Sequence, residues 1–106
     1  MEYKVIWSRF AEKRIDEIYD YYARKVNVRL AKKIVKNIII APNILIRNPK
    51  VGAEEQLLQH RKIEYRYIVT TNYKIIYSVE EKDHSIRIAD VFDTRQDPGK
   101  IEYRIP

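Results

Sequence analysis

The stretch YRYIVTTNYKIIYSVEEKDHSIRIADVF, residues 65–92, decides the fold. It contains three runs of strand length that are rich in β-branched and aromatic residues, at residues 65–70, 73–79 and 85–92. Two polar segments separate these runs, Thr71-Asn72 and then EEKDH at residues 80–84. Because short polar turns connect antiparallel neighbours, the stretch predicts three consecutive antiparallel strands.

The turns also predict which residues face each other across this sheet. With two-residue loops at both turns, Tyr77 lies opposite Arg66 on one side and Ile88 on the other. One face then carries Arg66, Ile68, Ile75, Tyr77, Ile88 and Phe92. The other face carries Tyr67, Val69, Ile76, Ala89 and Val91. Both faces are apolar enough to need cover, and a shift of one residue would exchange them.

Upstream, the sequence predicts a strand and two helices. Residues 3–7 alternate like a short strand, and Ser8 is placed to cap a helix that runs to about Lys25. A second helical pattern follows a short break, is kinked at Pro42 and ends before Asn48. Residues 47–62 are polar and irregular. The predicted class is therefore α+β: an N-terminal strand, an antiparallel helical hairpin and a small, mostly antiparallel sheet in the order βααβββ, all in one domain, residues 1–106.

Composition limits the classes of function. The 106 residues include no cysteine, which excludes disulfides and thiolate metal sites, and two distant histidines make no metal motif. No apolar run approaches the ~20 residues of a membrane helix, and the N-terminus does not resemble a signal peptide. We therefore expect a cytoplasmic protein with no cofactor, metal or membrane partner. The net charge of +6 is as consistent with a polyanionic partner as with a merely solvated basic surface.

The last predicted strand runs directly into a cluster of charges, DTRQDP at residues 93–98. Arg95 lies between Asp93 and Asp97, and Pro98-Gly99 stops regular structure. Two interpretations stay open. Either the guanidinium points outward toward an acidic macromolecule, or a carboxylate pairs with it to fix the exit from the strand.

The order of these segments resembles the RelE/ParE superfamily of type II toxins, the plasmid stabilisation proteins. The resemblance is carried by the step from Pro49 to Gly52 and by the segments YRYIV, NYKIIYSV and IRIADVFDTRQDP. It implies a growth-inhibiting toxin whose partner is a cognate antitoxin, with operator DNA bound only through that antitoxin. It also implies one of two targets: DNA gyrase, as in ParE-like members, or ribosome-bound mRNA, as in RelE-like members.

The RelE-like alternative implies a metal-independent endoribonuclease, which needs cations on the phosphate and proton carriers. The residues that match such roles are Arg66, Arg95, Tyr103, His60 and Glu64. Structural interpretations stand beside these: an ion pair of Arg66 with Asp90, and a C-terminal tail that packs through Ile101 and Tyr103. Candidates for target or nucleic-acid binding are Arg61, Lys62 and Arg95.

The exit R-x-D-P looks closer to the ParE-like pattern, so the sequence favours a binding inhibitor of gyrase that is not an enzyme. A third alternative is an inactive member that acts only as an antitoxin-binding co-repressor. The tyrosines at buried periods are interpreted as core residues whose hydroxyls stay wet; they are Tyr19, Tyr22, Tyr67, Tyr73 and Tyr77. The cations of the second helix, Arg29, Lys32, Lys33 and Lys36, are interpreted as a solvated face.

Overall fold

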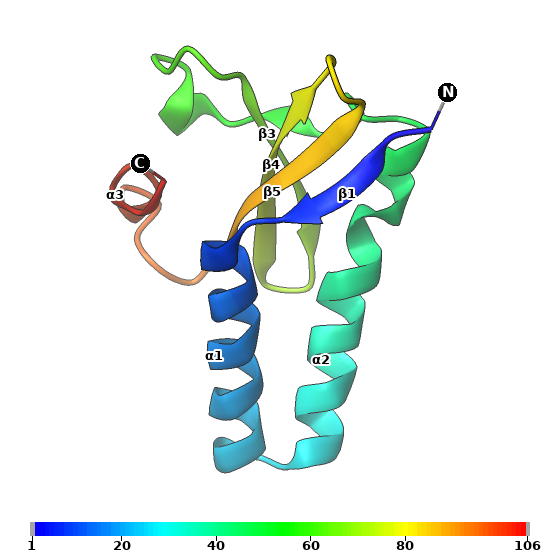
Figure 1. Ribbon diagram of the computed structural model, residues 1–106. Coiled ribbons are helices and arrows are strands. Elements are labelled where there is room, and N and C mark those ends of the chain that lie inside the picture. Colours follow the sequence, from blue (N-terminus) through cyan, green and yellow to red (C-terminus); the bar gives the residue numbers. More distant parts are fainter. Residues whose placement is uncertain (1, 106) are drawn as a thin grey trace.

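The computed structural model describes residues 2–105 and contains the predicted helical hairpin and sheet (Figure 1). The helices are α1 (Arg9–Lys25), α2 (Val28–Ile40) and α3 (Lys100–Arg104), with two 3-10 segments, η1 (Ala41–Ile46) and η2 (Gln56–Leu58). The strands are β1 (Lys4–Trp7), β2 (Ala53–Glu54), β3 (Tyr65–Thr70), β4 (Tyr73–Glu80) and β5 (Ser85–Asp93). The α+β class and the order of the predicted elements are therefore confirmed.

The sheet has five strands in the order β1-β5-β4-β3-β2. Strand β1 pairs parallel to β5, while the remaining neighbours are antiparallel, so the mostly antiparallel sheet is confirmed. Strand β2 was not predicted, because two residues in a polar stretch carry no alternating pattern. Together with η2 it gives regular structure to part of the segment that the sequence assigned to irregular loop.

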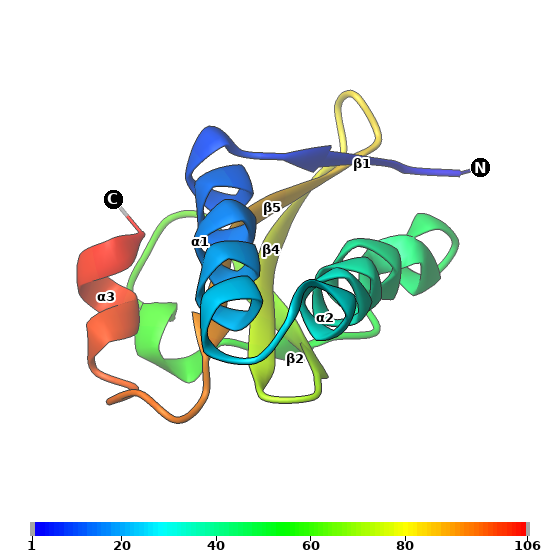
Figure 2. The same ribbon diagram turned by 90° about the horizontal axis from the view of Figure 1, so that it is seen from below.

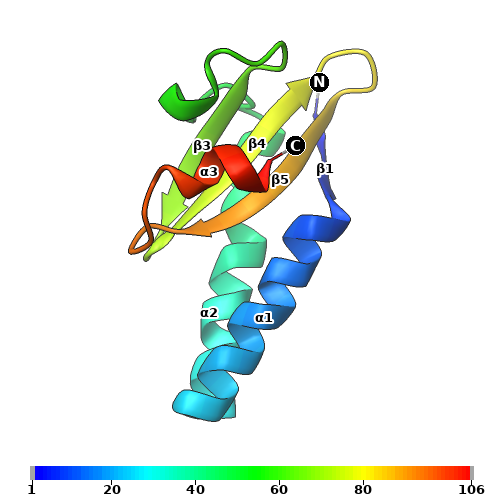
Figure 3. The same cartoon turned by 90° about the vertical axis from the view of Figure 1, so that its left-hand side faces the viewer.

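The helical hairpin lies against one face of the sheet, and α3 lies on the other (Figures 2 and 3). The Ser8 side chain accepts a hydrogen bond of 3.0 Å from the backbone N–H of Ala11, which confirms the predicted cap. Asn27 caps α2 in the same way through the N–H of Leu30. In the described residues, no helix combines the length and the apolar character needed to cross a membrane.

Pro42 changes the type of helix. The α-helix ends at Ile40, and the chain continues as the 3-10 segment η1, which contains Pro42 near its start. Proline lacks the N–H that would continue the α-helical ladder, so a tighter turn follows. The predicted kink and the end before Asn48 are therefore found as a change from α-helix to 3-10 helix.

The predicted register of the sheet is confirmed around Tyr77, which pairs with Arg66 on β3 and with Ile88 on β5. The second turn is longer than the predicted two residues, since Glu80 pairs with Ser85 and residues 81–84 form the loop. Beyond Ile88 the register shifts, because a β-bulge leaves one extra residue on β5 opposite the step from Ile76 to Tyr77.

The bulge corrects the predicted faces. Val91 packs with Tyr77 and Ile88 in the core under the hairpin, whereas Phe92 packs in the second core beneath α3. The sequence had assigned these two residues the other way round. An extra residue in a strand reverses the alternation of every later side chain, and nothing in IRIADVF marks where it is inserted.

The hydroxyl of Tyr77 fixes the loop before β2 from inside the core. It accepts a hydrogen bond of 3.0 Å from the Gly52 N–H and donates one of 2.7 Å to the Pro49 carbonyl. A Cβ added to Gly52 would lie 2.6 Å from this hydroxyl, so only glycine permits the approach. The P-x-x-G step is therefore a backbone anchor for the edge of the sheet.

We expect Tyr77→Phe to lower the free energy of unfolding by about 1–3 kcal/mol, because it leaves the buried N–H of Gly52 and the partly buried carbonyl of Pro49 without this partner. Chemical denaturation measures the loss. The matched control is Tyr21→Phe. Because Tyr21 is largely exposed, the loss of its hydroxyl should change the free energy of unfolding little. Equal losses in both variants would contradict the anchoring role.

Candidate functional site

Arg95 follows β5 directly and is held in one geometry by its neighbour. Its Nε and Nη2 donate to the two carboxylate oxygens of Asp93 at 3.0 and 2.8 Å, and its backbone N–H donates to Asp93 Oδ1 at 2.9 Å. Nη2 also donates to the Tyr22 hydroxyl at 3.3 Å. The side chain nevertheless stays 55% exposed. A carboxylate fork thus fixes the guanidinium, as the second interpretation expects, and the exposure leaves the first interpretation, an acidic macromolecule as partner, as a prediction.

Of the two aspartates, only Asp93 pairs with Arg95. Asp97 accepts instead a hydrogen bond from the Gly99 N–H and so closes the turn that leads to α3. The hydrogen bond from Arg95 holds the pKa of Asp93 below its ordinary value, and the same bond raises the pKa of Arg95. Both groups therefore stay charged across the physiological pH range.

A cleft of about 510 Å³ opens beside Arg95, which we call the Arg95 cleft. Helix α1, the first residue of β4 and the end of β5 with the turn after it form its walls. The lining side chains are Arg14, Glu17, Ile18, Tyr21, Tyr22, Tyr73, Asp93, Arg95 and Gln96. A hydrogen bond with Tyr73 lowers the pKa of Tyr22, whereas burial raises the pKa of Tyr73. The cleft thus presents the guanidinium groups of Arg14 and Arg95 beside aromatic hydroxyls, and each arginine is paired with a carboxylate that also lines the cleft.

Arg66 serves a different part of the molecule. Its Nη1 donates to the carbonyls of Gly52 and Lys50 at 2.8 and 3.2 Å, and Glu64 accepts from its Nε at 2.9 Å. Only 18% of the side chain is exposed. These contacts tie the loop before β2 to β3 and use most of the fork that a phosphate would need.

The predicted ion pair of Arg66 with Asp90 is wrong. Asp90 lies after the β5 bulge, on the opposite face, where it pairs with Arg104 at 2.7 Å. The acidic partners of Arg66 are Glu64 at 2.8 Å and Glu54 at 3.8 Å. The bulge that exchanged Val91 and Phe92 therefore also changed the partner of this arginine.

The remaining candidates are dispersed. Lys62 and Glu64 line a cavity of about 340 Å³ together with Arg66. Arg61 donates to the Glu102 carbonyl at 3.0 Å and so ties its loop to α3, while His60 is exposed on the same loop. Tyr103 is 88% exposed on α3, so the expected tail packing occurs through Ile101 alone of the two residues named.

The two arginines expected on one phosphate lie far apart. Arg66 pairs with Tyr77, whereas Asp93, the partner of Arg95, pairs with Tyr73. Four residues of β4 separate these positions, which is about 13 Å of strand. The structure therefore brings Arg66 together with Glu64 and Lys62, and Arg95 together with Tyr22, but it does not join the two groups.

Two features of the site were missed by the sequence. Tyr22 and Tyr73 were assigned to the core, and both do pack there, but the Tyr22 hydroxyl also reaches Arg95. Helix α3 was not predicted, because its five residues, Lys100–Arg104, are too few to show a helical period. Among residues 2–105, no group of three His, Cys, Asp or Glu side chains is placed to hold a metal ion.

The Asp93–Arg95 contact gives a test in acid. Because its pKa is lowered in the folded protein, Asp93 stabilises the fold above its ordinary pKa of 3.8, and this contribution is lost as the pH falls through the lowered value. We expect Asp93→Asn to cost at most about 1 kcal/mol at neutral pH, because the pair is partly exposed, and the difference in unfolding free energy from the wild type to narrow below pH ~4. Urea unfolding at a series of pH values measures this difference, and a difference independent of pH would contradict the contact.

Comparison with known protein families gives a match over most of the chain. A family model described as the ParE toxin of the type II toxin–antitoxin system ParDE matches residues 5–98. No curated protein matches.

Three solved structures share the fold at low sequence identity. A chromosomal ParDE system from Pseudomonas aeruginosa is similar with a TM-score of 0.70 and 20% identity, over 87% of this chain and 96% of that one. The toxin–antitoxin complex RelBE2 from Mycobacterium tuberculosis gives 0.58 and 17%, over 88% and 99%. An archaeal RelE–RelB complex from Pyrococcus horikoshii gives 0.50 and 18%, over 92% and 100%.

Proposed function

This chain belongs to the ParE toxin family of type II toxin–antitoxin systems, and from that premise we propose that it arrests growth by binding DNA gyrase. The observation that carries the proposal is the Arg95 cleft, where an exposed guanidinium is fixed by Asp93 and Tyr22. A binding inhibitor needs complementary charge and shape at such a site, and it needs no proton carrier. The acidic surface that the cleft recognises is then part of gyrase.

The dispersal of the other candidates supports the same proposal. Cleavage of RNA requires a base, an acid and a cation around one phosphate. Tyr103 lies exposed on α3, Arg66 is engaged with two carbonyls, and about 13 Å of strand separates the levels of Arg66 and Arg95. These positions supply no such set around Arg95.

A second candidate function, ribosome-dependent cleavage of mRNA, rests on a different cavity. Lys62, Glu64 and Arg66 line it together with further cations, so a phosphate and a carboxylate base could meet there. Glu64 already forms an ion pair of 2.8 Å with Arg66, and this ion pair would have to break before either side chain could act on RNA. We therefore rank this function second.

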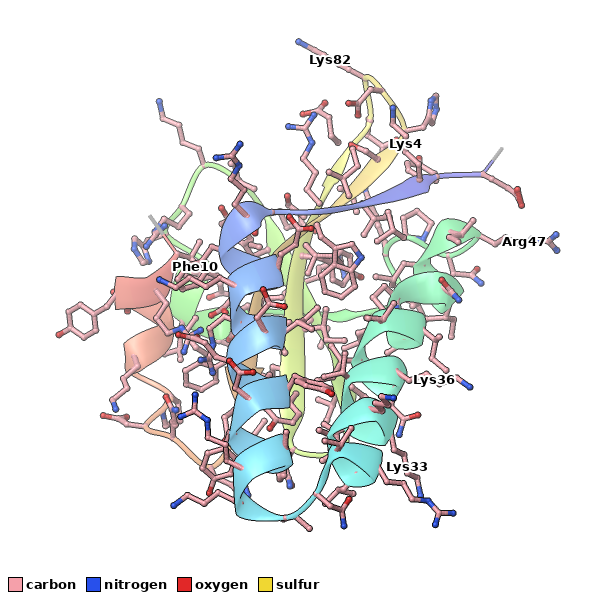
Figure 4. All side chains as sticks on the ribbon, turned by 60° about the horizontal axis from the view of Figure 1, so that its bottom comes forward. Lys4, Phe10, Lys33, Lys36, Arg47 and Lys82 are labelled. Carbon is pink, nitrogen blue, oxygen red and sulfur yellow. The ribbon has the colours of Figure 1, made fainter. Side chains whose placement is uncertain are left out.

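We propose a cognate antitoxin as the second partner of the chain, in the cytoplasm, as the toxin–antitoxin complexes with the same fold suggest. Helix α2 offers cations that point away from the sheet, among them Lys33 and Lys36 (Figure 4). The edges of the sheet, β1 and β2, offer unpaired backbone groups. An acidic segment on α2 or a strand added to an edge would suit these surfaces, and operator DNA would be reached through the antitoxin.

The test is to add the purified full-length chain to gyrase and relaxed plasmid, and separately to a translating extract. We expect supercoiling to stop at stoichiometric concentrations while the messages stay intact. Cleaved messages with active gyrase would replace the proposal by the second function. Activity in neither assay, with antitoxin binding retained, would indicate an inactive co-repressor.

A further inference from the structure

The positive charge of the chain is concentrated in one segment. Residues 21–53 contain eight lysines and arginines and neither aspartate nor glutamate, so this segment carries a charge of +8. The rest of the chain has 13 lysines and arginines against 15 aspartates and glutamates, a charge of −2. Charge that only keeps a protein in solution is spread over the surface with both signs interspersed. The net charge of +6 is therefore a property of one region.

Six of these eight cations lie on the helical hairpin, whose free end projects beyond the sheet (Figures 1 and 3). We call them the hairpin cations; they are Arg24, Lys25, Arg29, Lys32, Lys33 and Lys36. All six residues are exposed, and none of them forms an ion pair with a described residue. No carboxylate of the described chain therefore neutralises this surface by direct contact.

On α2 the placement of the cations opposes the stability of the helix. Arg29, Lys32 and Lys33 lie in its first two turns, where the helix dipole is positive, while its last turn contains no basic residue. Two like-charge pairs at a spacing of four, Arg29 with Lys33 and Lys32 with Lys36, add repulsion. Because cations that stabilise a helix belong at its C-terminal end, this arrangement points to an anionic partner outside the chain.

Three of the hairpin cations form a stripe along α2. Arg29, Lys33 and Lys36 lie within about 60° of one another around the helix and span about 10 Å along it. Figure 4 shows Lys33 and Lys36 on the side of α2 that points away from α1. One strand of duplex DNA presents a phosphate per ~3.4 Å of helix axis, so about three phosphates occupy the same length. The stripe and the strand therefore match in the spacing of their charges.

A lipid surface fits the hairpin less well than DNA does. A helix that lies in a membrane interface buries its apolar face among the lipids. The apolar face of α2 is already used, since Ala31 and Ile38 are fully buried against the rest of the chain. The large apolar residues exposed at the hairpin turn are two valines, Val26 and Val28, and not the aromatic residues that anchor proteins at an interface.

We propose that the hairpin cations form a binding surface for the phosphate backbone of duplex DNA. Contacts to phosphates carry no sequence information, so binding should depend on salt and not on base sequence. An acidic antitoxin segment on α2 would cover the same cations and exclude DNA.

This surface adjoins the Arg95 cleft. Tyr21, which lines the cleft, lies one turn before Arg24 and Lys25 on α1. A partner in the cleft and DNA on the hairpin could therefore be bound side by side. This step rests on the function proposed above: a chain whose cleft binds gyrase would place its hairpin on the DNA that gyrase holds.

The test is binding of the purified full-length chain to a short fluorescent DNA duplex, read by anisotropy at several salt concentrations. If three phosphates are neutralised, the affinity should fall roughly 40-fold between 50 and 200 mM salt. Two duplexes of unrelated sequence should bind equally. The stripe variant, Arg29→Gln with Lys33→Gln and Lys36→Gln, should lower the logarithmic slope against salt by about one for each position.

The control variant removes the same charge elsewhere, through Lys4→Gln, Lys82→Gln and Lys100→Gln. These three lysines are exposed and lie outside the hairpin, so the control should bind DNA like the wild type. The stripe variant should melt at the wild-type temperature or above, because it removes repulsion from α2. Equal weakening of DNA binding in both variants would assign it to net charge and overturn the inference, as would a wild type that does not bind DNA at low salt.

Two competitors identify the class of partner. Polyglutamate at the same concentration of negative charge should displace the duplex less well than unlabelled DNA does, and vesicles of phosphatidylserine and phosphatidylcholine should not sediment the chain. Displacement by polyglutamate equal to that by DNA would make an acidic protein the occupant of the hairpin. Sedimentation with the vesicles that is lost in the stripe variant would make it a lipid surface. Either result would overturn the assignment to DNA.

The DNA assay contains no gyrase, so it separates this inference from the proposed function. A wild type that binds DNA through the stripe but does not inhibit gyrase would remove the proposed function and keep the inference. A wild type that inhibits gyrase without binding DNA would do the reverse. Arg95→Ala removes a cation that Asp93 already neutralises, so it should bind DNA much like the wild type while it loses inhibition of gyrase.

Discussion

Arg95→Ala should abolish growth inhibition, and it should do so without unfolding the protein. A central charged contact that is truncated typically costs about 2 kcal/mol or more, which is a loss of roughly thirtyfold or more in affinity. Arg95 is 55% exposed, so its pair with Asp93 adds little to stability by comparison. Survival of cells after induction measures the loss of growth inhibition. Inhibition of gyrase by the purified variant measures the loss of affinity.

The control is Arg47→Ala, which removes an arginine that projects from the far side of the molecule (Figure 4). Arg47 is 82% exposed and reaches Glu2 only at 3.8 Å, so the variant should remain fully inhibitory. Arg95→Lys should be intermediate, because lysine keeps the charge but lacks the fork that grips Asp93. Full toxicity of Arg95→Ala would remove the Arg95 cleft from the site.

Most of the architecture was predictable because the relevant signals are local. Serine is a preferred N-cap residue, so Ser8 predicts the start of α1. The two-residue turn Thr71-Asn72 predicts the register between β3 and β4. The two-residue strand β2 and the short α3 carry no period long enough to read. These elements form because the rest of the molecule offers them an edge and an apolar face.

The partners of Asp90 and Arg66 were less predictable, because they depend on one inserted residue in β5. The bulge after Ile88 moves Asp90 away from Arg66 and toward Arg104. Because Asp90 faces the other side of the sheet, Arg66 instead binds the carbonyls of Lys50 and Gly52. A pair of Arg95 with a neighbouring aspartate was one of the two interpretations open from the sequence, and the observed pair with Asp93 spans only two residues and depends on no register.

Of all exposed and buried ion pairs, the one between Arg104 and Asp90 should be the most sensitive to substitution. Arg104→Met keeps an apolar side chain against Phe10 and Phe92 but leaves a buried carboxylate with its main partner removed. Breaking a buried pair from one side typically costs about 3–5 kcal/mol, a large part of the 5–15 kcal/mol that stabilises a domain. We therefore expect a melting temperature lower by at least about 10 °C.

Two matched variants separate charge from packing in this prediction. Arg87→Met makes the same substitution in a half-exposed pair with Asp83 and should cost at most about 1 kcal/mol. Asp90→Leu together with Arg104→Met removes both charges and should recover most of the loss. If the double variant is as unstable as Arg104→Met, the loss comes from the packing of α3 and not from the bare carboxylate.

The loss in Arg104→Met should also depend on pH, although the pKa of Asp90 is shifted in the opposite direction to that of Asp93. Burial raises the pKa of Asp90 above its ordinary value of 3.8, and removal of Arg104 takes away the largest influence that lowers it. A carboxyl whose pKa is raised by folding binds its proton more tightly in the folded state, so stability falls as the pH rises from the unfolded to the folded pKa. Arg104→Met should therefore be closest to the wild type in mild acid and weakest at neutral pH. Thermal melts across that range would show a constant deficit if Asp90 were already neutral in the folded protein.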